Sequence, residues 1–286
     1  MEKVLSNLID ITRKYFFYFR KGGIREFLKF YELNKFEKKI FKEKKLIWNE
    51  LGYWEVYPMP TDIELEKFYS EIYWLNNKYY KSNLVIPRDI SHLEFLQKNV
   101  LSKFNEKINF VNFGAGHGGI SYLMTTLSNV IINIEPSELN SYGHKNFINF
   151  KNIDNFIDNK ENYKKIDVLY SSHALEHLSD PITFFEKISK ILVDNGLVFI
   201  EVPNCRKAQI DKDYTEGGCD GKIWGSHLLY FTKDFFKKLD SEIFFVKEEE
   251  QGQRYIEVDS EDKADCIRAI IKAKNIKDWI KGSKIN

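Results

Sequence analysis

The spacing of hydrophobic residues changes near residue 108 of this 286-residue chain. Upstream, apolar residues recur close to the 3.6-residue period of an amphipathic helix, with an interruption at Gly22-Gly23. The pattern predicts helices across residues 1–50, a short extended stretch at 53–57, a helix at 61–73 and another at 89–103. The helix at 61–73 begins with Thr61 and, three residues later, Glu64, which is the pattern of a capping box.

Downstream of residue 108, short apolar runs alternate with amphipathic stretches. Strands are predicted at 108–113, 130–134, 148–153, 167–171 and 197–202, with one helix ending at 127 and another at 182–192. Such alternation is typical of a parallel, doubly wound sheet. Residues 243–247 and 254–258 are too close for a parallel crossover and are predicted to form an antiparallel hairpin. A helix at 233–239 precedes the hairpin, and an amphipathic helix over 262–281 is expected to close the chain.

These elements predict an α/β fold in two parts. Residues 1–86 are expected to form a mostly helical N-terminal extension. Residues 87–286 are expected to form a domain around a seven-stranded, mostly parallel sheet with an antiparallel terminal hairpin. The extension is expected to help bind a substrate, to form a homodimer or to contact a membrane surface.

Composition and charge narrow the class of protein. Hydrophobic residues make up 43% and charged residues 30%, as in globular domains. The net charge of +1 hides a basic segment, because residues 13–45 hold twelve Lys or Arg and four Glu. This surplus suits a phosphate-bearing ligand or an anionic membrane, and a solvated helical face explains it equally well. Three scattered cysteines and no signal-peptide pattern favour the cytoplasm over an oxidising compartment.

A cluster of glycines follows the first predicted strand. Gly114, Gly116 and Gly119 match the spacing GxGxxG, and Gly118 in place of Gly119 gives GxGxG. Glycines at a strand-to-helix turn let a ligand approach the backbone, and a helix N-terminus offers unpaired N–H groups. The cluster predicts a nucleotide or nucleoside site and leaves a purely structural turn open. His117, inside the turn, is expected to face solvent.

Glu135 ends the second predicted strand, about 20 residues after the glycines. A carboxylate at that place can accept hydrogen bonds from both hydroxyls of a ribose. Glu135 therefore supports a nucleoside cofactor without naming it.

Three further segments resemble class I S-adenosylmethionine-dependent methyltransferases. Residues 165–181 (KIDVLYSSHALEHLSDP) resemble the family's fourth strand, residues 195–204 (NGLVFIEVPN) its fifth strand, and residues 227–232 (HLLYFT) the entry to its next helix. The resemblance extends over residues 89–258 and is greatest to the branch that acts on sugars and other small metabolites. It implies a Rossmann-like fold, S-adenosylmethionine as cofactor, and O-methylation of a sugar or nucleotide sugar for surface polysaccharide biosynthesis.

The resemblance implies cofactor contacts from Asn112, Gly114, Ala115, Gly116, Gly118, Glu135, Pro136, Asp154, Ser172 and His173. Among these, the glycines would line the methionine part, Glu135 would bind the ribose, and Asp154 would contact the adenine. Ser172 and His173 would border the methionyl end. Asn112 departs from the family, which carries an acid at this position. An amide still accepts a hydrogen bond but brings no negative charge.

Methyl transfer to an alcohol needs the acceptor oxygen held in line and a route for its proton. His177, just past the fourth strand, is the first candidate for a general base, and His173 and His227 are the others; capping or packing explains His177 equally well. His173 and His177 also have the spacing of a metal pair, but because no carboxylate or cysteine set accompanies them no metal is expected. The candidate acceptor-binding residues are Tyr80, Arg88, Tyr214 and Trp224, with Arg88 also placed to face the cofactor's carboxylate.

Two alternatives from other classes stay open. A nicotinamide oxidoreductase would use the same glycines and Glu135, although the strand motifs and the antiparallel hairpin disfavour it. A non-catalytic cofactor-binding or scaffold protein would explain Asn112. Nucleic acid is not expected as a substrate, because Ser171-Ser172-His173-Ala174 stands where an Asn/Asp-Pro-Pro-aromatic motif would lie.

Overall fold

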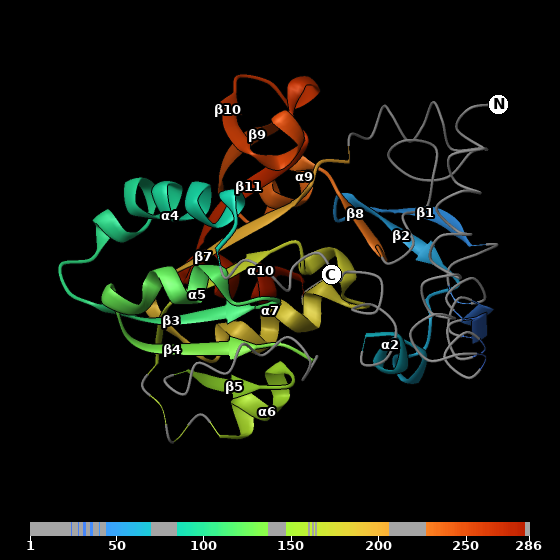
Figure 1. Ribbon diagram of the computed structural model, residues 1–286, viewed down its shortest axis with the longest axis horizontal. Coiled ribbons are helices and arrows are strands. Elements are labelled where there is room, and N and C mark those ends of the chain that lie inside the picture. Colours follow the sequence, from blue (N-terminus) through green and yellow to red (C-terminus); the bar gives the residue numbers. More distant parts are fainter. Residues whose placement is uncertain are drawn as a thin grey trace.

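The computed structural model describes residues 44–69, 85–136, 147–159, 161, 163, 165–205 and 227–283, together with seven positions between 24 and 40. Within these residues the chain forms an eight-stranded mixed sheet and a separate three-stranded sheet (Figure 1). No helix in the described ranges is long and apolar enough to cross a membrane.

Five parallel strands form one half of the larger sheet, as the alternating pattern predicts. They are β3 (Ile108–Phe113), β4 (Ser128–Ile134), β5 (Ile148–Phe150), β6 (Ile166–Ser172) and β7 (Leu192–Pro203). The full strand order is β10-β9-β11-β7-β6-β3-β4-β5. The order reverses at β3, so the connections after β3 and β6 leave in opposite directions. A crevice at the carboxyl ends of these strands follows from that reversal.

Helices cover both faces of this sheet. On one face α4 (Pro87–Asn99) and α5 (Gly119–Leu123) pack in a core cluster that contains Phe95, Ile120 and Phe199. On the other face lie α6 (Ile153–Asp158), α7 (Pro181–Ser189) and α10 (Ala273–Ser283), in a cluster with Phe185, Val198 and Ile276. Val198 and Phe199 belong to opposite clusters because neighbouring residues of a strand point to opposite faces. Short 3₁₀ turns extend α4 at Leu101–Lys103 and α5 at Met124–Thr126.

The closing segment differs from the helix expected over residues 262–281. Cys266–Lys272 form strand β11, and only Ala273–Ser283 form a helix. β11 inserts antiparallel between β7 and β9 (Glu242–Glu249), and β9 pairs with the edge strand β10 (Arg254–Val258). The hairpin is thus confirmed, but the sheet has eight strands rather than seven. All of β11 before Lys272 is buried, and periodicity does not separate a short buried strand from a buried helix.

The three-stranded sheet contains the second departure from the expected elements. Lys45–Asn49 form strand β1, so the helix expected up to residue 50 is wrong for this segment. β1 pairs with β2 (Tyr53–Tyr57), whose extended form is confirmed, and β2 pairs with β8 (Leu229–Phe231) from far along the chain (Figure 1). An isolated two-stranded hairpin is only marginally stable in water, so β1 and β2 need the pairing with the distant strand β8 to form a stable sheet. The division of the chain at residue 86 stays a prediction.

Two expected helix starts are confirmed by their capping contacts. The Thr61 hydroxyl accepts a hydrogen bond from the Glu64 N–H (3.3 Å), and the Glu64 carboxylate accepts one from the Thr61 N–H (3.0 Å), at the start of α2 (Asp62–Lys67). At the start of α9 (Lys233–Lys238), the Thr232 hydroxyl accepts a hydrogen bond from the Asp234 N–H. Side-chain caps of this kind satisfy backbone donors that the first turn leaves unpaired.

Gly52, in the turn between β1 and β2, contacts the start of α9 through its backbone. Its φ angle is +103°, and a Cβ atom there would lie 2.5 Å from the backbone nitrogen of Phe235. The Thr232 hydroxyl donates to the Gly52 carbonyl at 2.8 Å. Only glycine combines this left-handed conformation with such a close approach.

Replacing Gly52 by alanine is expected to lower the free energy of unfolding by about 3 kcal/mol, because left-handed strain adds to the overlap with α9. Urea unfolding of Gly52→Ala measures this loss. Gly282→Ala is the control, since a Cβ atom there meets nothing within 4 Å and alanine favours helix. Equal stability of the two variants would contradict the close contact between the turn and α9.

Candidate active site

A cavity of about 490 Å³ opens at the carboxyl ends of β3, β4 and β6, where the strand order reverses. Cofactor and small-molecule sites have volumes of this size. Residues from the glycine turn, from α4, from the end of β6 and from the segment before β8 share its wall. Of the predicted site residues, the cavity brings together Arg88, Asn112, Gly114, Ala115, Gly116, Glu135, Pro136, Ser172, His173, His177 and His227.

The glycine turn contacts the end of β4 and the residues that follow β6. Gly114 has a φ angle of +71°, and a Cβ atom there would lie 2.4 Å from the Cβ atom of Ala174. The N–H groups of Gly114 and Ala115 both donate to the Ile134 carbonyl. The Gly116 N–H donates to the Glu135 carboxylate at 2.9 Å, which orients that side chain at the cavity wall. The turn and the ribose-binding candidate thus form one unit.

Some predicted contacts lie elsewhere. Gly118 has a φ angle of +78° and is the N-cap residue of α5, and it is not part of the cavity wall. The exposed Asp154 carboxylate lies 2.8 Å from Lys187 Nζ on α7, whereas the preceding residues Asn152 and Ile153 line the cavity. Tyr80, Tyr214 and Trp224 lie outside the described residues.

Asn112 belongs to a buried chain of amide and hydroxyl groups. Its Nδ2 donates to Ser121 Oγ at 2.8 Å, and that hydroxyl donates to Asn133 Oδ1 at 2.7 Å. The Asn112 amide supplies the N–H donor of this network, which a carboxylate would lack. Asn112 Oδ1 is buried with no hydrogen-bond partner in the described part of the chain, and its residue lines the cavity. This orphan acceptor fits a ligand that carries N–H or O–H donors.

His117 does not face solvent as expected. Its side chain is only 13% exposed, and its Nε2 lies 2.8 Å from Asp89 Oδ2. The same carboxylate accepts a hydrogen bond from the Ile86 N–H at the start of α4. The pair therefore joins α4 to the glycine turn at one side of the cavity, and it brings Arg88 of the first turn to the cavity wall.

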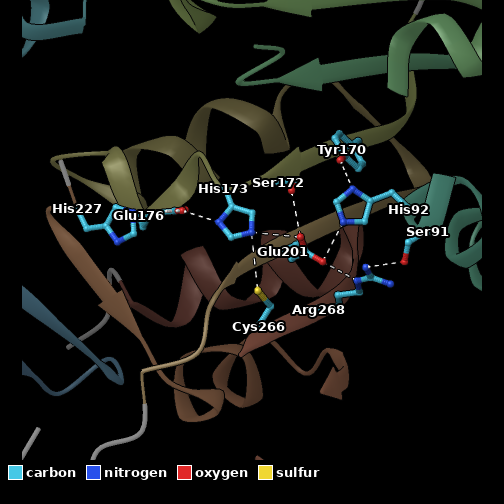
Figure 2. A network of polar contacts seen from close by, with 10 residues as sticks. All are labelled: Ser91, His92, Tyr170, Ser172, His173, Glu176, Glu201, His227, Cys266 and Arg268. Carbon is cyan, nitrogen blue, oxygen red and sulfur yellow. Dashed lines mark hydrogen bonds and ion pairs between the residues drawn. The ribbon is translucent and has the colours of Figure 1, made fainter. Parts of the chain in front are cut away.

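A network of buried charged groups lies beneath the end of β6 (Figure 2). Glu201 of β7 is its centre, with Arg268 Nε at 2.6 Å, His92 Nε2 at 2.9 Å and His173 Nε2 at 3.3 Å. On its other side, His173 Nδ1 lies 3.4 Å from Glu176. Glu201, Arg268, His92 and Glu176 are each at most 3% exposed. The network extends through His92 Nδ1 to the Tyr170 hydroxyl at 2.5 Å.

The ionisation states of this network follow from opposing effects. Burial raises the pKa of Glu201, but its neighbours His92 and Arg268 hold that pKa well below its usual range. Burial likewise raises the pKa of Glu176, but the contact with His173 and the nearby imidazoles lower it to about 2. Burial lowers the pKa of His92 below its usual range. Charge inside the network balances when His173 and Arg268 are both cationic.

His173 is held as an imidazolium. Burial lowers its pKa, but contacts with Cys266, Glu176 and Glu201 outweigh burial and raise the pKa well above 6.5. Its backbone has a φ angle of +50°, an uncommon conformation that aims the ring between the two carboxylates. Because both ring nitrogens carry protons in this state, His173 cannot accept a proton from an acceptor hydroxyl. The two remaining histidine candidates are His177 and His227.

His177 and His227 lie together at the other end of the cavity wall. Their ring centroids are 5.0 Å apart, and the ring of Tyr69 packs on His177 at 5.8 Å. A backbone hydrogen bond from the Leu228 N–H to the Glu176 carbonyl (2.8 Å) holds the two segments together. Burial lowers the pKa of His227 to about 4, so its imidazole is neutral at physiological pH. Tyr69 was not among the predicted site residues.

Sequence reasoning also missed Glu176, Glu201 and Arg268. Glu201 stands between Ile200 and Val202 in an apolar strand, and Arg268 stands in the apolar run Cys266–Ile271. A charged residue inside a buried strand requires a partner, and that signal was available in both segments. The sequence does not say that the two are partners.

Replacing Arg268 by methionine is expected to lower the free energy of unfolding by about 3 to 5 kcal/mol, since it leaves Glu201 buried without its main counter-ion. The double variant Arg268→Met/Glu201→Gln is expected to lose less. Lys263→Met is the matched control, because Lys263 and Asp259 form an exposed pair and its loss costs at most about 0.5 kcal/mol. Denaturant unfolding of the wild type, the two single variants and the double variant measures these differences. Equal losses of unfolding free energy in Arg268→Met and Lys263→Met would contradict the role of the buried pair.

His173 is expected to give stability that depends on pH. The pKa of His173 is raised in the folded protein above its unfolded value of about 6.5. The imidazolium therefore contributes fully to the free energy of unfolding below pH 6.5, and this contribution is lost as pH rises through the folded-state pKa. His173→Asn keeps a residue that tolerates positive φ but removes the charge. The difference in unfolding free energy between wild type and variant is therefore expected to shrink from pH 6 to pH 9. A constant difference across the series would show that His173 is not an imidazolium.

Comparisons with known proteins agree with this geometry. A family model described as a methyltransferase domain matches residues 91–242, which is more than half of the chain. A search of curated proteins finds no significant match.

Two of the solved structures to which this chain is similar are S-adenosylmethionine-dependent methyltransferases. That of Thermotoga maritima is 12% identical (TM-score 0.48, covering 73% of this chain and 100% of that chain), and that of Archaeoglobus fulgidus is 17% identical (TM-score 0.46, covering 71% and 100%). Magnesium protoporphyrin IX methyltransferase of Synechocystis PCC 6803, with bound S-adenosylhomocysteine, is 11% identical (TM-score 0.45, covering 73% and 99%). The family match carries the assignment: the chain belongs to the class I S-adenosylmethionine-dependent methyltransferases.

Proposed function

We propose that this enzyme methylates a hydroxyl oxygen of a sugar or nucleotide sugar. The observation that carries the proposal is a single cavity with two chemically different ends. One end holds the glycine turn, Asn112 and Glu135, which suit a nucleoside cofactor. The other holds His177 and His227 beside the ring of Tyr69, which suit a polar acceptor with an apolar ring face.

The cofactor end offers contacts for the ribose, the amino group and the carboxylate of S-adenosylmethionine. Glu135, oriented by the Gly116 N–H, would accept the ribose hydroxyls. Asn112 Oδ1 would accept from the amino group, and Arg88 would face the carboxylate. Ile153, rather than Asp154, is at the cavity wall on the side assigned to the adenine. When bound, the cofactor supplies a methyl group activated by a positively charged sulfur.

The acceptor end has to orient a hydroxyl group and remove its proton. His173 is already protonated, so its role is to hold Glu176 and Glu201 in place rather than to act as a base. His177 and His227 remain as the groups that ionise the acceptor. The basic segment 13–45, which is mostly outside the described residues, would attract the phosphates of a nucleotide sugar.

Calorimetric titration is expected to detect micromolar binding of S-adenosylmethionine and S-adenosylhomocysteine, and no binding of NADH. Glu135→Ala is expected to weaken both affinities by about 10- to 100-fold, the value of charge-assisted hydrogen bonds to two hydroxyls. Asp154→Ala is the matched control and is expected to bind normally, since its carboxylate pairs with Lys187 outside the cavity. The acceptor class is then tested by a one-methyl mass gain on nucleotide sugars. Tight cofactor binding without a methylated sugar would reject the acceptor proposal, and no binding would favour a scaffold.

A further inference from the structure

Glu176, His177 and His227 form a compact group of potential metal ligands. One ligand atom from each lies within 4.8 Å of the other two. Glu176 and His177 are neighbours in the 3₁₀ turn Leu175–His177, and the Leu228 N–H bond to the Glu176 carbonyl holds His227 beside them. All three residues line the cavity at its acceptor end.

The Glu176 carboxylate carries the strongest sign of a missing ligand. Its side chain is 1% exposed, and neither oxygen has a hydrogen-bond partner within the described residues. His173 at 3.4 Å and His227 at 4.0 Å are near enough for charge attraction but are not aligned as hydrogen bonds. A buried carboxylate normally accepts several hydrogen bonds or binds a cation. Here its oxygens are buried beside two imidazoles at the cavity wall.

We propose that Glu176, His177 and His227 bind a divalent transition metal of the zinc type, which takes the acceptor hydroxyl as a further ligand. The proposal rests on the proposed O-methylation and deepens it, because it says how His177 and His227 ionise the acceptor. Two imidazoles and one carboxylate, with a position left open, are a ligand set found in catalytic zinc sites. Imidazole nitrogen favours zinc and similar ions over magnesium, which prefers oxygen.

A neighbouring group of potential ligands is less suited to a metal. His173, Glu201 and Cys266 also lie close together, but Arg268 already occupies Glu201 at 2.6 Å. Glu176, by contrast, has two imidazoles beside it, His173 at 3.4 Å and His227 at 4.0 Å, and His173 is itself held by Glu201 (Figure 2). The chain Arg268–Glu201–His173–Glu176 therefore acts as the outer support that metal-binding carboxylates require.

The chemistry of such a site is balanced without an additional reactant. Coordination of the acceptor oxygen lowers the pKa of its hydroxyl, and the proton leaves to solvent. The oxygen then forms a bond to the methyl carbon while the carbon–sulfur bond breaks, and the sulfur keeps the electron pair and becomes neutral. The site thus takes the place of a basic side chain.

Titration of the chelator-treated full-length protein with Co²⁺, which replaces Zn²⁺ and absorbs visible light when bound by histidine, tests the proposal. One equivalent of Co²⁺ is expected to bind with the development of visible bands, and Zn²⁺ is expected to displace it. His177→Ala and His227→Ala are each expected to weaken binding at least about tenfold, as loss of a metal ligand does. His117→Gln is the matched control, because His117 pairs with Asp89 and is not in the group.

Glu176→Gln keeps the size of the side chain and is expected to weaken Co²⁺ binding as well. Thermal unfolding of each metal-free variant establishes that it is folded. No Co²⁺ binding to the wild type, or binding unchanged in both His177→Ala and His227→Ala, would overturn the site. Binding of Mg²⁺ in preference to Zn²⁺ would also overturn it.

Calorimetry with S-adenosylmethionine on the same metal-free protein separates this proposal from the proposed function. Cofactor binding without Co²⁺ binding would reject the metal site and leave the methyltransferase assignment intact. If the folded, metal-free protein does not bind S-adenosylmethionine, the proposed cofactor contacts are wrong, and this result leaves the Co²⁺ titration as the separate test of the metal site.

Discussion

The buried pair of Glu201 on β7 and Arg268 on β11 is the interaction on which the rest of the site depends. The two residues stand directly opposite each other in the antiparallel register of these strands. A slip of β11 by one residue would turn Arg268 to the other face of the sheet and leave two uncompensated charges in the core. The apolar residues on either side of Arg268 would tolerate such a slip far better. The pair therefore specifies the register of the inserted strand.

That same pair sets the electrostatics of the cavity. Glu201, once balanced by Arg268, holds His173 as a cation, and His173 holds Glu176 as an anion. Glu201, Arg268 and Glu176 are buried and the His173 side chain is 27% exposed, so the effective dielectric constant is low and the contacts act over short, fixed distances. A structural ion pair in the sheet is thereby extended to a carboxylate at the acceptor end. Stability and the chemistry of the site have a common origin here.

The two ends of the cavity come from different kinds of structure. The cofactor end is formed by loops that follow directly on the strands β3 and β4, and their lengths and glycines are local features of the sequence. The acceptor end needs contacts between distant segments: the turn at Leu175–His177, the segment leading into β8, and Tyr69. The pairing of β8 with β2 and the contact of Gly52 with α9 hold these segments in place.

The sequence by itself determined the parallel core, the terminal hairpin, the glycine turn and Glu135, because periodicity and strand-end chemistry are local properties. It left β1 and β11 as helices, since a short buried strand and a buried helix have the same apolar composition and only a distant partner decides between them. It also suggested Asp154 as the adenine contact, but in the structure the Asp154 carboxylate forms an ion pair with Lys187 on a neighbouring helix. The partnership of Glu201 with Arg268, the protonation of His173 and the meeting of Glu176, His177 and His227 were decided only by the tertiary structure. Charge balance in a buried site is a property of all its neighbours together, and those neighbours lie up to 177 residues apart along the chain.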